Sequence, residues 1–313
     1  MFLMLKIYKS FFLTAVFITL AACSHSPQQV AEQKLLKPRY GHSAISDGKL
    51  LYNIAGSGRL GLINDIEVLD PKTGKQWQLG VTVLPRRYFG AAFDGDHSIC
   101  ILGGNSRGLD RRPVGRNVEK VDLLTGNVTI VTRMPETAAF VSAVSMGREI
   151  MVFGGIEYKN DGEKGVADAV AYNTVSGTWR KLTDMPVPRA TRAVVHQEWV
   201  YLVGGFDGQR AVTAFERYNP KTDQYETLAP LPQKMSAHSA VVSKGKLLVF
   251  GDYDQRDLTY SYDFATKEWQ QTNIGYTAAR HTGAAVVGEQ VFVTGGNVKS
   301  NDSFLSNIQQ FKF

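Results

Sequence analysis

The feature that most constrains the fold is an apolar segment ending in a glycine pair, which recurs along nearly the whole chain. Four copies keep both glycines, and two degenerate copies, Ala55-Gly56 and Gly251-Asp252, keep one. The first position of the pair falls at residues 55, 103, 154, 204, 251 and 295. A period of about 50 residues is typical of units that bury their apolar faces only by packing on one another. The spacing therefore predicts six copies of one structural unit.

A second motif follows each apolar segment and has the residues of a tight turn. Asp or Asn begins the turn, often with Pro next and Thr-Gly after it, as in Asp70–Gly74. Such residues favour a hairpin between two strands. Large aromatic side chains close the motif and should fill the spaces between neighbouring units: Trp77, Trp179, Tyr225 and Trp269. The second unit has Val128 instead, so we expect less good packing there.

Short apolar strands with frequent turn signals, and no helical periodicity of useful length, indicate an all-β protein. The combined motifs resemble the kelch repeat, and the resemblance covers Leu35–Phe313. It implies a six-bladed β-propeller with four strands in each blade around a central channel. The propeller should occupy residues 34–313, with the repeats at 38–85, 86–135, 136–188, 189–232, 233–274 and 275–313.

The register of the repeats also predicts how the ring closes. The last repeat stops at Phe313, after the third strand of its blade. The segment Ala31–Leu36 lies where the last strand of a preceding repeat would sit. We therefore expect the N-terminal strand to complete the last blade and leave no long exposed edge.

The first 22 residues have the pattern of a signal peptide, with Lys6 and Lys9 before the short apolar run Phe11–Ala22. This run is too short for a spanning helix. The sequence Leu20-Ala21-Ala22-Cys23 resembles the lipobox of bacterial lipoproteins, which implies cleavage before Cys23 and acylation of that residue. Residues 23–33 would then be the lipidated cysteine and a polar tether. Ser24 resembles the signal that sorts such proteins to the periplasmic face of the outer membrane. An ordinary signal peptide with a chance cysteine is the alternative.

Charge and cysteine content exclude several classes of function. The net charge of +6 falls to +4 without the two leader lysines, which is too small and too evenly spread for nucleic-acid binding. Cys100 lies in an apolar strand and should be a buried thiol. We expect no disulfide, and no cofactor or metal.

Three motifs that suggest a cofactor or metal fail on their context. Gly56–Gly61 matches a dinucleotide fingerprint, but a strand pattern follows it where a helix is required. Asp252, Asp254 and Asp257 lack the glycine and glutamate of a calcium loop. His42, His238 and His281 occupy about the same position in their repeats, which favours a structural role.

The most informative polar residues are basic, and they lie in the turn that enters the innermost strand of a blade. In kelch propellers these turns line one mouth of the channel. Arginine forks and neighbouring aromatic rings there suit a carboxylate or an acidic sugar. The candidate ligand-binding residues are Arg39, Arg87, Arg189, Arg192, Lys234 and Arg280, with Tyr40 and Tyr88 beside them. The alternative is that each arginine pairs with a local carboxylate and stabilises the fold.

Two long loops, Asn105–Asn117 and Ile156–Ala167, could carry specificity. The first holds four arginines, Arg107, Arg111, Arg112 and Arg116.

Together these observations predict a lipid-anchored periplasmic propeller that serves as a binding or scaffold module for an envelope protein or an anionic glycan. The alternative is a cofactor-free mutarotase or epimerase for an acidic sugar such as sialic acid, since periplasmic kelch proteins of that activity resemble this one. Proton transfer at an anomeric centre needs only a positioned acid and base. Glu136 and Glu157 are candidates without a recognisable constellation. A partly buried carboxylate of raised pKa at the channel mouth beside the arginines would favour the enzyme.

Overall fold

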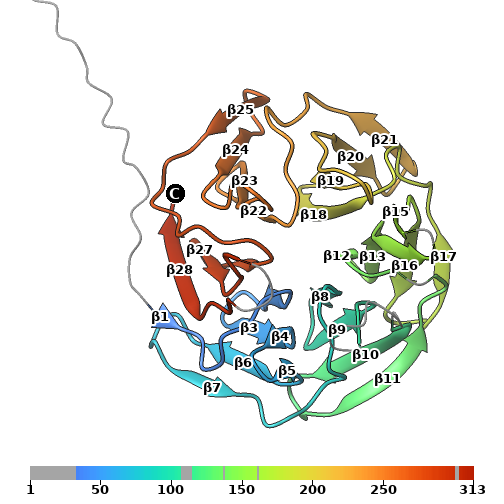
Figure 1. The fold of residues 1–313 in the computed structure, drawn as a ribbon. Coiled ribbons are helices and arrows are strands. Elements are labelled where there is room, and N and C mark those ends of the chain that lie inside the picture. Colours follow the sequence, from blue (N-terminus) through green and yellow to red (C-terminus); the bar gives the residue numbers. More distant parts are fainter. Residues whose placement is uncertain (1–32, 107–114, 137, 161, 300–302) are drawn as a thin grey trace, which may run out of the picture.

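The chain folds into a ring of six four-stranded antiparallel sheets around a central channel, so the predicted six-bladed propeller is confirmed (Figure 1). The computed structural model describes residues 33–106, 115–136, 138–160, 162–299 and 303–313. The expected signal peptide, Cys23 and nearly all of the tether lie outside these residues. Within them, no helix is long and apolar enough to cross a membrane.

In blades 1 to 5 the strands follow chain order from the channel outward, because each hairpin motif adds the next strand beside the last. Blade 1 contains β2 (Ser43–Ser46), β3 (Leu51–Ile54), β6 (Ile66–Leu69) and β7 (Gln76–Gln78). Blade 2 contains β8 (Gly90–Phe93), β9 (Ser98–Leu102), β10 (Asn117–Asp122) and β11 (Val128–Arg133). Blade 3 contains β12 (Ser142–Met146), β13 (Glu149–Phe153), β16 (Ala169–Asn173) and β17 (Trp179–Lys181).

The remaining blades repeat this plan. Blade 4 contains β18 (Ala190–His196), β19 (Trp199–Phe206), β20 (Phe215–Asn219) and β21 (Gln224–Thr227). Blade 5 contains β22 (Ser239–Ser243), β23 (Lys246–Phe250), β24 (Thr259–Asp263) and β25 (Glu268–Gln271). Blade 6 contains β26 (Gly283–Val287), β27 (Gln290–Thr294), β28 (Asn307–Lys312) and β1 (Gln33–Lys34). Two small hairpins lie between blade strands: β4 (Ser57–Gly58) with β5 (Gly61–Leu62), and β14 (Ile156–Lys159) with β15 (Gly162–Gly165).

The two ends of the described chain meet in blade 6, as predicted. Strand β1 pairs with β28, with Gln33 opposite Ile308 and Lys34 opposite Asn307. Figure 1 shows the first strand beside the last one at the point where the ring closes. The N-terminal strand therefore supplies the outer strand of the last blade.

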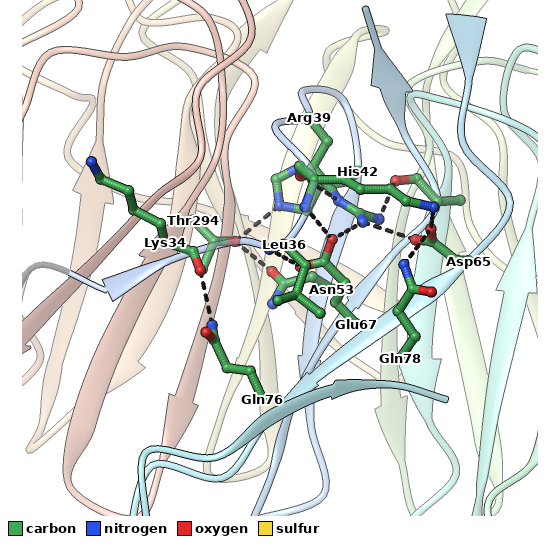
Figure 2. A network of polar contacts seen from close by, with 12 residues as sticks. Lys34, Leu36, Arg39, His42, Asn53, Asp65, Glu67, Gln76, Gln78 and Thr294 are labelled. Atoms are coloured by element: carbon green, nitrogen blue, oxygen red, sulfur yellow. Dashed lines mark hydrogen bonds and ion pairs between the residues drawn. The ribbon is translucent and has the colours of Figure 1, made fainter. Parts of the chain in front are cut away.

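A polar network holds the segment after β1 against blade 1 (Figure 2). The carboxylate of Glu67 accepts hydrogen bonds from the backbone N–H of Leu36 and of Lys37, both at 2.8 Å. It also pairs with the buried guanidinium of Arg39. Across the same seam, His42 Nε2 lies 2.9 Å from Thr294 Oγ1 on blade 6. The closure therefore depends on buried polar contacts as well as on strand pairing.

The glycines of the recurring pairs, at or near the end of the second strand of a blade, adopt a left-handed conformation that side chains disfavour. In blade 4, Gly204 has φ of 52° and Gly205 has φ of 123°. A Cβ at Gly205 would lie 1.8 Å from the carbonyl oxygen of Ala190. The first position is crowded too, since a Cβ at Gly154 in blade 3 would lie 2.2 Å from the carbonyl oxygen of Arg189, although blade 1 has Ala55 there with φ of 51°. The close approach of the neighbouring backbone explains the glycines at both positions.

The aromatic residues of the turn motif fill the seams between blades, but Trp77 does so differently. Trp179, Tyr225 and Trp269 pack on the core shared with the preceding blade. Trp77 follows its turn aspartate one residue later than these aromatic residues do, so its side chain points to the other face of its sheet. It packs in the seam between blades 1 and 2, together with Val128. Trp77 of the first repeat thus fills the space that the small side chain of Val128 leaves in this seam.

Candidate functional site

A cavity of about 1020 Å³ lies at the mouth of the channel, where the turns that enter the inner strands converge. Blades 2 to 6 all contribute to its wall. The charged and aromatic wall residues include Arg87 and Tyr88 from blade 2, Phe140 from blade 3, Arg192 from blade 4, Lys234 and Tyr253 from blade 5, and Arg280 and His281 from blade 6. No single blade forms this surface, so the cavity exists only in the assembled ring.

A chain of backbone hydrogen bonds joins the turns of neighbouring blades at the wall of the cavity. The N–H of His281 donates to the carbonyl of Ala237, and the N–H of Gly41 donates to the carbonyl of His281, at 2.7 and 2.9 Å. Tyr88 donates to Gly41, and Phe140 donates to Tyr88, at 2.7 and 2.6 Å. All five residues have a left-handed backbone, with φ between 54° and 62°. This geometry fixes the positions of the Tyr88, Phe140 and His281 side chains.

Blade 4 interrupts this chain of hydrogen bonds. The pairing of β18 with β19 shifts register between Ala190 and Arg192, and no residue there takes the left-handed conformation of the other blades. The side chain of Arg192 reaches instead toward blade 5, where its Nε donates to the carbonyl of His238 at 2.9 Å. Burial lowers the pKa of Arg192 to about 10. Arg192 therefore lies in blade 4 at the point where the chain of left-handed turns is interrupted.

The arginines of the cavity are held by neutral groups. Arg87 Nη1 donates to the hydroxyl of Tyr40 at 2.8 Å. Arg280 Nη1 donates to the carbonyl of Tyr253 at 3.0 Å, and its guanidinium lies 3.8 Å from the centre of the Tyr253 ring. Within the described part of the chain, neither of them forms an ion pair with a carboxylate, and neither does Arg192. Three guanidinium groups thus converge in the cavity without a carboxylate partner of their own among the described residues, although Glu163, Asp252 and Asp254 also line its wall.

His281 lies among these arginines. Its ring centre is 5.0 Å from that of Tyr88, 6.1 Å from that of Phe140 and 6.3 Å from that of Tyr253. Burial lowers the pKa of His281 to about 3, and the positive charges of Arg280, Arg192 and Arg87 add to the effect. The imidazole is therefore neutral at physiological pH.

The predicted equivalence of the three histidines is wrong by one residue. Strand pairing shows that His42 and His238 share a position directly before the inner strand, whereas His281 lies one residue earlier. The Nε2 atoms of His42 and His238 contact Thr294 Oγ1 and the carbonyl of Val203, at 2.9 and 3.0 Å. His42 and His238 are therefore part of the framework, and only His281 belongs to the left-handed turn.

Arg39 and Arg189 do not line the cavity, which corrects their predicted place in the channel mouth. They are fully buried, and so is Arg86, which we did not predict. Each donates to the carbonyl of the first residue of its glycine pair and to a glutamate on the third strand of its blade. The ion pairs are Arg39 with Glu67, Arg86 with Glu119 at 2.5 Å, and Arg189 with Glu216. Tyr40 is also buried, behind Arg87.

In the other three blades both members of this pair are replaced by uncharged residues: Ala138 with Val170, Met235 with Tyr260, and Ala279 with Gln309. In blade 3 the replacement leaves a cavity of about 90 Å³ on the side facing blade 2. The candidate acids Glu136 and Glu157 lie at this smaller cavity and not at the channel mouth. Glu157 also lies 3.2 Å from the amino group of Lys159.

Asp252 is a buried carboxylate on the wall of the large cavity. Its oxygens accept hydrogen bonds from the backbone N–H groups of Ser236, Asp254 and Gln255, at 2.7, 2.9 and 3.2 Å. These bonds hold two turns together, so Asp252 is engaged in the framework. Among the described residues, no group of three histidine, cysteine or acidic side chains is placed to hold a metal ion.

The structure also shows where the glycine motif, Cys100 and the described parts of the two long loops lie. Gly56–Gly61 lies in the β4–β5 turn region, and strand β6 follows it. Cys100 is buried in β9, and burial raises the pKa of its thiol to about 12. The loop Ile156–Ala167 contains the β14–β15 hairpin, whose Tyr158 lines the large cavity. Of the four loop arginines, Arg116 donates from Nε to the carbonyl of Met134 at 2.8 Å. Arg107, Arg111 and Arg112 lie outside the described residues.

Comparison with known proteins agrees with the fold. Residues 138–186 and 189–232 match the Kelch motif. The chain is 28% identical to Kelch-like protein 25 of Xenopus tropicalis over 65% of this chain and 35% of the relative. It is 26% identical to human Kelch-like protein 38 over 79% and 42% of the two chains, and 24% identical to Kelch-like protein terF of Aspergillus terreus over 68% and 50%.

The matched region spans between about a third and half of the length of these relatives. The six sheets of four strands form a six-bladed propeller, and these matches support its description as a propeller of kelch repeats. Kelch propellers are typically protein-binding scaffolds.

Proposed function

We propose that the protein is a lipid-anchored periplasmic binding module whose channel-mouth cavity takes an anionic group, carried by an envelope protein or by an anionic glycan. The observation that carries this proposal is the convergence of Arg87, Arg192 and Arg280 in one cavity without a carboxylate partner among the described residues. Anchoring and location rest on the lipobox-like sequence before Cys23.

Arginines that are held in place by neutral groups favour binding of an anion for a physical reason. Most of the cost of burying a guanidinium has already been met during folding, since neutral hydroxyl and carbonyl groups hold each one in place. A carboxylate would add charge-assisted hydrogen bonds to donors that are already oriented. Lys234 lies exposed on the cavity wall and adds a further positive charge.

Aromatic rings on the same wall favour a ligand that has flat apolar faces next to its acidic group. Tyr88 and Phe140 stack on each other with ring centres 4.0 Å apart. Tyr253 has 48% of its surface exposed at the mouth, although Arg280 lies against its ring. Acidic sugars and acidic peptide segments both meet this description.

Calorimetric titration of the detergent-solubilised full chain tests the proposal. The probes are galacturonate, N-acetylneuraminate and a short glutamate-rich peptide. We expect at least one probe to bind, and Arg192→Ala to weaken binding by about 10- to 100-fold, the value of one or two charge-assisted hydrogen bonds. Arg148→Ala is the control, because Arg148 is exposed in the β12–β13 turn, at the opposite end of its blade from the cavity. Equal weakening by both substitutions, or no binding at all, would reject the cavity as the site.

The second candidate function is a cofactor-free mutarotase or epimerase for an acidic sugar. The observation in its favour is His281, a neutral imidazole on the cavity wall that could exchange a proton with a sugar hydroxyl. Nuclear magnetic resonance of anomer exchange in the same sugars distinguishes the two functions. Acceleration that is lost in Arg192→Ala would make the protein an enzyme, and binding without acceleration would leave it a binding module.

A further inference from the structure

We propose that the bound anion sits on the guanidinium groups of Arg87, Arg192 and Arg280 around the imidazole of His281, and that His281 takes up a proton as the anion binds. The ligand group would be an oxyanion, such as the carboxylate of an acidic sugar or of an acidic side chain. This inference rests on the proposed function and adds the position of the anion and a dependence on pH.

The position of His281 is fixed by its own backbone. Its N–H donates to Ala237, its carbonyl accepts from Gly41, and its φ is 55°. The residue is 8% exposed, and its side chain lines the cavity. A buried imidazole with a fixed backbone can respond to a ligand by changing its protonation state rather than by moving away.

His281 also lacks the hydrogen bonds that the other two buried histidines make. No hydrogen bond from the described residues engages its Nε2, while its Nδ1 is buried without a partner, as it is in His42 and His238. In His42 and His238 the Nε2 atom is used by the framework. An unpartnered nitrogen on the wall of a cavity is available to a ligand, because a buried polar group gains free energy from a partner.

Three positive charges from three blades act on His281, and Lys234, Arg210, Glu163, Asp252 and Asp254 also line the cavity. The three charges are those of Arg280 from its own turn, Arg192 from blade 4 and Arg87 from blade 2. The neighbouring rings are those of Tyr40, Tyr88, Phe140 and Tyr253. Asp252, on the same cavity wall, is engaged by three backbone N–H groups.

Protonation of His281 is opposed by burial and by these three positive charges, which together lower its pKa to about 3. An anion seated on the arginines cancels their charge and offers an acceptor for an imidazole N–H. Both effects favour the charged imidazole, so anion binding raises the pKa of His281. By linkage, affinity then increases as the pH falls, by up to tenfold per pH unit for one proton taken up.

The test is calorimetric titration of the detergent-solubilised full chain with sodium sulfate and with sodium galacturonate between about pH 5 and pH 8. Two buffers of different ionisation enthalpy give the number of protons taken up. We expect affinity to rise several-fold or more from the upper to the lower pH, with proton uptake. His281→Gln should bind with little change over this range. His97→Gln should keep the dependence, since His97 is a half-buried histidine in the β8–β9 turn, beside Asp96 and Asp122, and does not line the cavity.

A second measurement does not depend on how well the variants fold. The ¹⁵N resonances of the His281 imidazole in the wild-type chain should show a neutral ring without the anion and a charged ring with it. If the probes bind with an affinity that is independent of pH, and the imidazole stays neutral in the complex, the inference is wrong and the proposed function stands. If neither probe binds at any pH, the anion cavity itself is wrong and both fall together.

Discussion

The buried ion pair of blade 4 allows a quantitative test of the framework. Arg189 donates to Glu216 and to the carbonyl groups of Gly204 and Val187, at 2.7 and 2.8 Å from those oxygens. Glu216 is 2% exposed, and its carboxylate accepts hydrogen bonds only from Arg189 among the described residues. Arg189→Met therefore leaves a buried carboxylate without a partner.

Removing one member of a buried ion pair costs about 3–5 kcal/mol of unfolding free energy. That is a large part of the stability of a typical domain. The double variant Arg189→Met, Glu216→Leu gives blade 4 an uncharged pair, as blade 5 has in Met235 and Tyr260. It should recover most of the loss, because replacing both partners by apolar groups is often close to neutral.

The loss should also depend on pH with a definite sign. Burial already raises the pKa of Glu216, against the opposing effect of Arg189. Without Arg189 the pKa rises further, so the folded state binds a proton more readily than the unfolded state does. Arg189→Met should therefore lose less stability at about pH 5 than at about pH 8.

Urea unfolding followed by tryptophan fluorescence measures both effects in the single and the double variant. A loss below about 1 kcal/mol for Arg189→Met would refute the reasoning, since it is the value of an exposed pair. Equal losses at the two pH values, or a double variant as unstable as the single one, would also refute it.

Three further predictions concern stability and anchoring. The pKa values of His42, His238 and His281 are all lowered to about 3, chiefly by burial, while unfolded histidine titrates near 6.5. The unfolded state takes up these protons first, so stability should fall as the pH drops below about 6.5, by up to about 1.4 kcal/mol per pH unit for each histidine. A urea midpoint that does not change between about pH 7 and pH 5 would contradict this assignment. Gly205→Ala should cost more than about 4 kcal/mol, because its Cβ meets the Ala190 carbonyl. Gly275→Ala, with φ of 68° and no atom near, should cost about 1–2 kcal/mol, and similar thermal midpoints for the two would argue against the close approach. Radiolabelled palmitate should be incorporated in a bacterial host, lost in Cys23→Ser and kept in Cys100→Ser; incorporation that survives Cys23→Ser would exclude the lipobox interpretation.

The number of blades and the closure of the ring could be predicted because their signals are local and repeated. Each unit carries a glycine pair and a turn motif, and both reflect backbone conformations that few residues adopt. The missing outer strand of the last repeat pointed to the segment before Pro38, and β1 (Gln33–Lys34) lies there. Such features require no knowledge of the distant contacts.

The roles of the arginines could not be predicted in the same way, because a shift of one residue along the chain changes an arginine from a framework residue to a cavity residue. Arg86 points into the blade and Arg87 lines the cavity, although they are adjacent. Which role an arginine has depends on how the strands pair, including the register shift in blade 4, and the spacing of the motifs does not determine this pairing. One sequence signal was available: Glu67, Glu119 and Glu216 each lie three residues before the turn residue of their repeat, and these are the blades in which an arginine and a glutamate form a buried ion pair.

The same one-residue ambiguity affected His281 and Trp77. His281 resembled His42 and His238 by spacing, but it lies in the left-handed turn and lacks their framework contacts. Trp77 resembled the other aromatic residues, but it lies one residue further from its turn aspartate than they do from theirs, so its side chain faces blade 2. A shift by one residue reverses the face of a strand, so spacing has to be read to the single residue.

The most direct test of the central claim combines one change in the ligand with one change in the protein. Binding of galacturonate and of its neutral methyl ester is measured by calorimetry, in the wild-type chain and in Arg192→Ala. If the cavity recognises an anion through its unpaired arginines, the wild-type chain should prefer the acid by about tenfold or more, and the variant should lose most of that preference. Equal binding of acid and ester by the wild-type chain, or a preference that Arg192→Ala leaves intact, would contradict the claim.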